Sequence, residues 1–114
     1  MSNEVVMFSA IMSVWKRDDP NLFQMALNSI LNQTTLPSEF ILVIDGSLNE
    51  CQYQIINDTK GKFQDAGINF VTAVHAENQG HAVARQTALS MCKCEYVAIC
   101  DADDLNHQNR FEKL

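Results

Sequence analysis

Short apolar runs alternate with longer amphipathic stretches along the chain, and this alternation constrains the fold more than any other sequence feature. Four runs have the length and composition of β-strands, at residues 8–14, 40–44, 68–74 and 96–100. Between them apolar residues recur at helical spacing, as in the stripe that contains Phe23, Leu27 and Ile30. Strands that alternate with helices favour a mostly parallel sheet with helices on its faces. The chain is therefore expected to form an α/β fold of about four strands.

Helix boundaries are marked as well. Asp19 stands before a proline, a typical helix start, because aspartate accepts hydrogen bonds from the free amides of the first turn. Asn49 is a candidate cap for a second helix, and Gly67 suits the C-terminal end of that helix. A third helix is expected over residues 81–91, and Asn106 is a candidate cap for a fourth.

Composition limits the function. The 114 residues fit one domain or part of one, and a net charge of -6 without a basic stripe argues against a nucleic-acid partner. The first residues lack a signal-peptide pattern, and apolar runs fall short of the roughly 18 residues that a membrane span needs. The four cysteines lack zinc-site spacing, which indicates reduced thiols in a cytoplasmic protein. The three histidines are expected in loop or capping roles rather than as metal ligands.

Residues capable of chemistry follow the expected strands. They are Ser13 and Trp15 after the first, Asp45 after the second, and Asp101, Asp103 and Asp104 after the fourth. Open parallel sheets bind ligands outside the carboxyl ends of their strands. Clustered carboxylates repel one another unless a cation neutralises them, and Mg²⁺ and Mn²⁺ prefer such oxygens. An acidic loop or a set of helix caps would use the same residues, so D-x-D alone leaves both interpretations open.

Two further motifs are ambiguous in isolation. Asp45 with the following glycine suits contact with a base or ribose, but an ordinary strand-to-helix turn has the same sequence. Residues 78–80 (NQG) and Arg85 lie near the start of the third helix, where Arg85 would reach a nucleotide, pair with an aspartate or remain on the surface. Trp15 would either stack on a base or pack beside the first strand.

Taken together and in order, the segments resemble glycosyltransferase family 2, whose members have the GT-A fold. The matching segments are residues 10–15 (AIMSVW), 27–34 (LNSILNQT), 41–47 (ILVIDGS), 77–86 (ENQGHAVARQ) and 95–104 (EYVAICDADD). The chain departs from the family pattern at Ile44, where the family usually has an aspartate, and at Lys16 and Gln86, where asparagine is common.

The resemblance implies a role for each matching residue. Ser13 would lie at the floor of the nucleotide pocket, Asp45 would bind uracil or ribose, and Asp101 would touch ribose or sugar. Asp103 would hold Mn²⁺ or Mg²⁺ against the diphosphate. The nucleotide-sugar-binding set is completed by Trp15, Arg85 and Ala102.

The resemblance also implies an overall function. Residues 1–114 would form a Rossmann-like GT-A half-domain, the N-terminal nucleotide-sugar-binding portion of an inverting glycosyltransferase. The donor would be a nucleoside-diphosphate sugar, with UDP expected, and the acceptor a glycan or lipid-linked hydroxyl in bacterial surface polysaccharide synthesis. The enzyme would be cytoplasmic or peripheral at the inner membrane face. The catalytic base and acceptor region are expected beyond Leu114, so the isolated chain would be inactive and would self-associate through an exposed sheet edge.

Two other classes remain open. A sugar-phosphate nucleotidyltransferase shares a similar half-domain, but residues 13–19 lack the glycine-rich, basic loop that such enzymes carry. A non-catalytic module that binds nucleotide weakly and recruits a partner is the second alternative.

Overall fold

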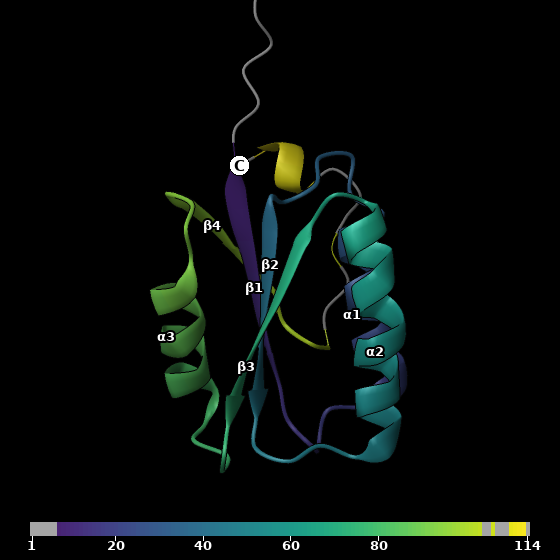
Figure 1. The fold of residues 1–114 in the computed structure, drawn as a ribbon, viewed down its shortest axis with the longest axis vertical. Helices are drawn as coiled ribbons and strands as arrows, with labels where there is room; N and C mark the ends of the chain where they lie inside the picture. Colours follow the sequence, from purple (N-terminus) through teal and green to yellow (C-terminus); the bar gives the residue numbers. More distant parts are fainter. Residues whose placement is uncertain (1–6, 104–105, 107–109, 114) are drawn as a thin grey trace, which may run out of the picture.

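The computed structural model describes residues 7–103, 106 and 110–113 and contains a parallel four-stranded sheet (Figure 1). Its elements are β1 (Phe8–Val14), α1 (Pro20–Leu31), β2 (Glu39–Asp45), α2 (Glu50–Asp65), β3 (Asn69–His75), α3 (His81–Met91), β4 (Tyr96–Ile99) and the 3₁₀ turn η1 (Phe111–Lys113). The strand order is β3-β2-β1-β4, and each neighbouring pair is parallel. The expected α/β fold with about four parallel strands is confirmed.

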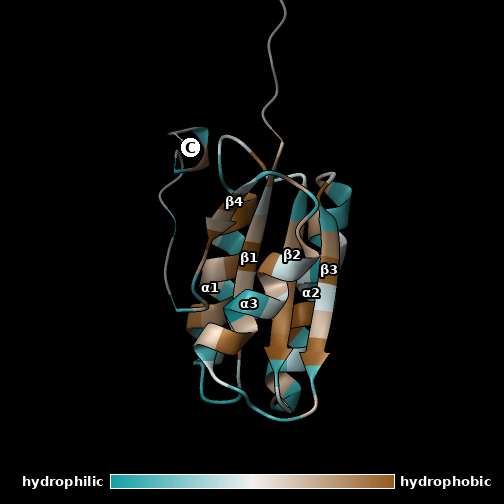
Figure 2. Cartoon of the chain, turned by 90° about the vertical axis from the view of Figure 1, so that its left-hand side faces the viewer, coloured by the Kyte–Doolittle hydropathy of each residue, from teal (hydrophilic) through white to brown (hydrophobic). Residues whose placement is uncertain are grey.

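Helices cover both faces of this sheet. Helices α1 and α2 lie on one face and α3 lies on the other (Figure 1). Strand side chains alternate between the faces, so Met12 and Leu42 pack toward α1 and α2, whereas Ile11, Ile41 and Val43 pack against α3. The strands are accordingly apolar along the centre of the sheet, with polar residues collected near the loops (Figure 2). Because both faces are covered, β2 is buried along its whole length.

The helices begin and end where the sequence predicts. The carboxylate of Asp19 accepts hydrogen bonds from the amides of Asn21 and Leu22 at 2.8 and 3.1 Å. Asn49 caps α2 in a capping box with Gln52. Gly67 follows the end of α2 with φ +85°, a left-handed conformation that suits glycine. The expected cap role of Asn106 concerns a helix over residues of which 107–109 lie outside the described part of the chain.

Strand ends differ slightly from the prediction. Strand β2 begins one residue earlier, at Glu39, whose buried carboxylate accepts hydrogen bonds from the Ser9 hydroxyl at 2.5 Å and the Lys93 amide at 2.7 Å. Strand β4 ends at Ile99, one residue before the predicted Cys100. A charged residue gives no hydrophobic signal, so the buried Glu39 could not be placed in the strand from periodicity.

Strands β3 and β4 are the two edges of the sheet, and both leave apolar side chains in contact with solvent. Val74 is 67% exposed and Tyr96 is 58% exposed. Within the described residues, no helix is long and apolar enough to cross a membrane.

Candidate functional site

The carboxyl ends of the strands surround a cleft of about 420 Å³. It is lined by Ser13, Val14, Trp15, Asp18, Asp45, Asn78, Gly80, His81, Asp101, Ala102 and Asp103. The cleft thus brings together six of the seven predicted site residues, including the two acidic groups from separate strand ends. It lies where ligands bind in open parallel sheets.

Asp45 forms one wall of the cleft and is held entirely by the protein. Its side chain is 4% exposed. One carboxylate oxygen accepts hydrogen bonds from His75 Nδ1 at 2.8 Å and the Gln79 amide at 2.9 Å. The other accepts from Asn78 Nδ2 and the Gly80 amide, both at 3.1 Å. Burial alone would raise the pKa of Asp45, but these hydrogen bonds outweigh it and hold the pKa below the ordinary value.

This arrangement gives Asp45 a structural task that the sequence did not reveal. A carboxylate offers about four acceptor positions, and here four donors of the chain itself use them. The expected contact of Asp45 with uracil or ribose stays a prediction, while the structure shows its hydrogen bonds to the loop at residues 78–80.

Gly46 allows that loop to approach. It has φ +88°, and a Cβ atom at this position would lie 2.8 Å from the backbone nitrogen of Asn78. Any side chain would therefore push the loop away from Asp45 as well as strain the backbone. The neighbouring Ile44, which departs from the family pattern, is buried on the opposite face in the core of α1 and α2.

The opposite wall consists of carboxylates that face solvent. Asp103 is exposed, and the Asp101 side chain is 42% exposed. Asp18, at the loop after β1, lines the same wall and accepts a hydrogen bond from the Trp15 amide at 3.0 Å. Partial burial, together with the negative charges of Asp103 and Asp101, raises the pKa of Asp18. Asp104 lies outside the described residues.

These carboxylates fit a hard divalent cation that keeps part of its hydration shell. Within residues 7–103, 106 and 110–113, no three histidine, cysteine or acidic side chains converge as a metal cage. Magnesium is usually held by only one or two carboxylates, with water and substrate phosphates as its remaining ligands. Exposed carboxylates at the mouth of a cleft match that pattern better than they match a structural metal site.

His81 links several residues at the floor of the cleft. Its Nδ1 lies 3.3 Å from the Ser13 hydroxyl. Its Nε2 lies 3.0 Å from Arg85 Nη2 and 3.5 Å from the Asp101 carboxylate. Arg85 itself does not line the main cleft but borders a small neighbouring cavity between α3 and the sheet. Arg85 was expected to reach a nucleotide, pair with an aspartate or remain on the surface, and the structure pairs it with His81.

The loop after β1 is fixed from the start of α2. The buried Gln52 side chain donates hydrogen bonds to the carbonyls of Trp15 and Asp18, both at 2.9 Å. Asn49 donates a third bond to the Lys16 carbonyl at 3.2 Å. Trp15 remains partly exposed at the cleft, with the Arg17 guanidinium 5.4 Å from its ring centre.

Sequence reasoning missed four residues of this site: Asp18, Gln52, His75 and His81. Asp18 stands before the expected helix cap Asp19 and drew no separate expectation, and a polar residue inside a helix, such as Gln52, is usually solvated. The two histidines were expected only in loop or capping roles. For His75 a usable signal existed. Strand side chains alternate, so the last residues of β2 and β3, Asp45 and His75, are partners in the register and point to the same face.

Comparison with known proteins agrees with this geometry. The model of the family described as glycosyl transferase family 2 matches residues 9–114. A relative from Escherichia coli, named UDP-Gal:alpha-D-GlcNAc-diphosphoundecaprenol beta-1,3-galactosyltransferase, is 30% identical over 112 residues. That match covers 98% of this chain and 39% of the relative, so the chain spans about two fifths of the length of this protein.

Two solved structures have the same fold. The crystal structure of TarS from S. aureus superimposes with a TM-score of 0.75 and 22% identity, covering 95% of this chain and 18% of that one. The mannosyltransferase PcManGT from Pyrobaculum calidifontis, solved in complex with GDP-Man and Mn²⁺, gives a TM-score of 0.74 and 22% identity. The second match covers 89% of this chain and 29% of PcManGT.

Proposed function

The chain belongs to glycosyl transferase family 2, and on that premise we propose that it forms the donor-binding part of a glycosyltransferase. The enzyme would move a sugar from a nucleoside diphosphate to a hydroxyl group of a glycan or lipid-linked acceptor. One observation carries this proposal: aspartates from two separate strand ends share a single cleft of about 420 Å³. Such a volume lies within the range of small-molecule sites.

The acidic wall is the proposed cation and diphosphate site. Asp103 would hold Mn²⁺ or Mg²⁺, with Asp101 directed at the ribose or sugar. When bound, the cation would supply positive charge that neutralises the departing diphosphate. The carboxylates keep this wall polar and open to solvent, which leaves room for the remaining ligands of the cation.

The other residues would orient the nucleotide. Ser13 lies at the floor of the cleft, Trp15 offers an aromatic face at its rim, and Ala102 leaves space between the two acidic residues. Asp45 would contribute from its wall, chiefly by holding the loop that Asn78 and Gly80 present to the cleft.

For the donor we propose a UDP-sugar, transferred with inversion. The E. coli relative carries UDP-Gal in its name, whereas PcManGT was solved with GDP-Man. The experiment below therefore tests the nucleotide base of the donor. We place the enzyme in bacterial surface polysaccharide synthesis, in the cytoplasm or at the inner membrane face. A lipid-linked acceptor, such as the one in the name of the E. coli relative, would be presented there.

Self-association through the sheet edge is also part of the proposal. Strand β4 is an edge of the sheet among the described residues, with Tyr96 and Ile99 in contact with solvent, so a second copy would pair there. Sedimentation velocity over a range of concentrations would reveal a dimer, and a monomer at high concentration would contradict this part.

The main test is calorimetric titration of UDP into the chain with and without Mn²⁺. Wild type should bind UDP more tightly with Mn²⁺, and Asp103→Asn should lose that increment. Asp65→Asn, a change of the same kind at the far end of α2, is the matched control and should behave as wild type. Binding of UDP that is independent of Mn²⁺ and of Asp103 would end the cation proposal, and preference for GDP would overturn the assigned base.

A further inference from the structure

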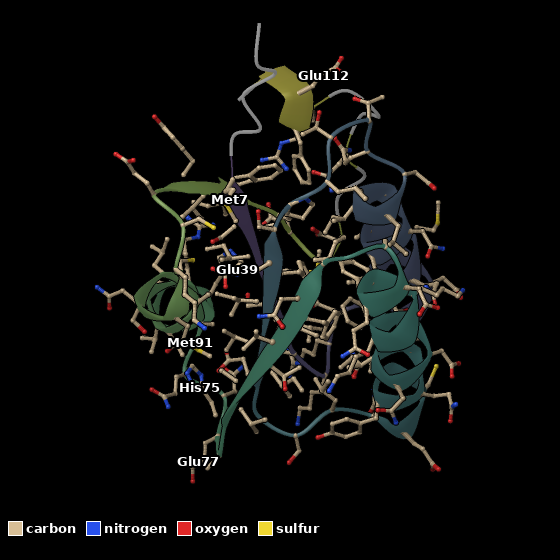
Figure 3. The ribbon with its side chains drawn as sticks, turned by 45° about the horizontal axis from the view of Figure 1, so that its top comes forward. Met7, Glu39, His75, Glu77, Met91 and Glu112 are labelled. Atoms are coloured by element: carbon tan, nitrogen blue, oxygen red, sulfur yellow. The ribbon has the colours of Figure 1, made fainter. Side chains whose placement is uncertain are left out.

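His75 joins the cleft to the helix on the far side of the loop. It ends β3, its side chain is 10% exposed, and both ring nitrogens have partners. Nδ1 lies 2.8 Å from the Asp45 carboxylate, and Nε2 lies 2.9 Å from the Thr87 hydroxyl on α3. Figure 3 shows His75 between the end of β3 and α3, with Glu77 beyond it at the tip of the loop.

One hydrogen of this chain of contacts can be assigned. An ionised carboxylate only accepts hydrogen bonds, so Nδ1 of His75 donates to Asp45. The Thr87 hydroxyl lies within hydrogen-bond distance of both Nε2 of His75, at 2.9 Å, and the Val83 carbonyl, at 3.1 Å. The ring of His75 is therefore held from both sides, by Asp45 of β2 and by Thr87 of α3.

We propose that His75 is a positioning residue of the donor cleft: held between Asp45 and Thr87, it orients the Asp45 carboxylate that in turn holds the loop at residues 78–80. The charged group that contacts the ring is Asp45 of β2, and α3 presents the neutral Thr87. The nucleotide-binding part of this inference rests on the proposed function.

The loop depends on these hydrogen bonds because packing gives it little support. Asn78 and Gln79 are exposed, yet three consecutive residues each donate a bond to Asp45. Two of the three, Asn78 and Gly80, line the cleft. If the carboxylate turned away, the loop would lose its anchor and the cleft would lose part of its wall. A preformed wall raises affinity because less ordering is needed when the ligand binds.

Three variants of the full 114-residue chain test the proposal. His75→Phe keeps an aromatic ring and removes both hydrogen bonds, whereas the shorter amide of His75→Asn can still donate to Asp45. Ile68→Val is the matched control, since it removes one buried methylene just before β3 at the opposite end of the strand. Each variant is measured by hydrogen exchange of the Gln79 and Gly80 amides and by titration of UDP with Mn²⁺.

His75→Phe should speed exchange at Gln79 and Gly80 and weaken UDP binding, each by about tenfold, the scale seen when a supporting partner is removed. His75→Asn should recover most of both losses, and Ile68→Val should change neither by more than about twofold.

Unchanged loop exchange in His75→Phe, or equal losses in Ile68→Val, would overturn the positioning role. If wild type fails to bind UDP, the proposed function fails, while the exchange of the two loop amides still decides whether His75 positions the loop. If His75→Phe does not fold, His75→Leu, which also lacks a donor for Asp45, takes its place, and unchanged loop exchange in that variant would overturn the positioning role.

Discussion

Strands β2 and β4 both lead into the same cleft, and each is followed or ended by aspartate. Asp45 is buried at the end of β2, with four donors from the protein around its carboxylate. Asp103, four residues beyond the end of β4 at Ile99, is exposed on the other wall of the cleft. Aspartate therefore serves two purposes at this edge of the sheet: Asp45 holds the surrounding loop in place, and Asp103 is available to a ligand.

Position in the sheet explains this difference. Strand β2 has a neighbour on each side and helices on both faces, so a charge at its end is cut off from water and must be satisfied by the protein. Strand β4 is an edge, and its end remains open to solvent. The contrast teaches that burial, and not the motif, decides which aspartate is free to bind.

Removal of the Asp45 carboxylate should have the largest effect. Asp45→Ala leaves His75 and the three donors of the loop without their acceptor, so the free energy of unfolding should fall by about 3 kcal/mol. Asp103→Ala should change it by less than about 0.5 kcal/mol, as usual for an exposed residue. Urea denaturation of both variants measures the two losses, and similar losses would break the comparison between the walls.

Gly46→Ala should be the next largest change. The new Cβ meets the Asn78 backbone at 2.8 Å, at a positive φ that costs a non-glycine residue about 1–3 kcal/mol by itself. Gly67→Ala is the matched control, because it has nearly the same φ and nothing within 4 Å of its Cβ. Thermal and urea unfolding should show Gly46→Ala to be the more destabilised by about 1 kcal/mol or more, the steric part of the cost. Equal losses of unfolding free energy in Gly46→Ala and Gly67→Ala would mean that the loop at Asn78 moves away from the new Cβ at no cost.

Much of the fold was predictable because its signals are local. Apolar runs marked all four strands, and the Asp19 cap marked the start of α1 at the residue where the structure has it. The error at β2 has a physical cause, since a hydrophobic pattern does not register the buried Glu39. Its partners Ser9 and Lys93 are 30 and 54 residues away, and a short stretch of sequence does not indicate contacts between such distant residues.

The site was predictable in its membership and less so in its contacts. Chain connectivity brought Ser13, Asp45, Asp101 and Asp103 to one cleft, because parallel strands end at the same edge. That same reasoning could not say that Asp45 is saturated by the loop, or that Arg85 contacts His81. Those outcomes depend on side-chain distances of a few ångströms, which follow from packing and not from residue order.

The charge on Asp45 should account for part, but not all, of its contribution to stability. Its pKa lies below the ordinary value of 3.8, so the carboxylate stabilises the fold above that pH, and this stabilisation is lost as pH falls through the lower folded value. The gap in unfolding free energy between wild type and Asp45→Asn should be constant near neutral pH and should narrow below pH 3.8. Urea titrations from neutral to acid pH measure it, and a gap that widens in acid would contradict the assigned direction.

Asp18→Asn should give the smallest change, and one of opposite sign. Burial and the negative charges of Asp103 and Asp101 raise the pKa of Asp18, so its ionised form destabilises the fold. Asparagine keeps an oxygen for the Trp15 amide and removes the charge, so the variant should be more stable by up to about 0.5 kcal/mol, a figure kept small because solvent screens this half-exposed group. The gain should be present at neutral pH and should fade as pH falls toward 3.8 and below, since Asp18 then becomes neutral in both states.

Added Mn²⁺ should reduce the stability gain of Asp18→Asn if the cation binds at the acidic wall, because the cation offsets the same repulsion that the substitution removes. A destabilised Asp18→Asn would show that the carboxylates of this wall do not repel one another, and the division of the cleft into one saturated and one available wall would then fail.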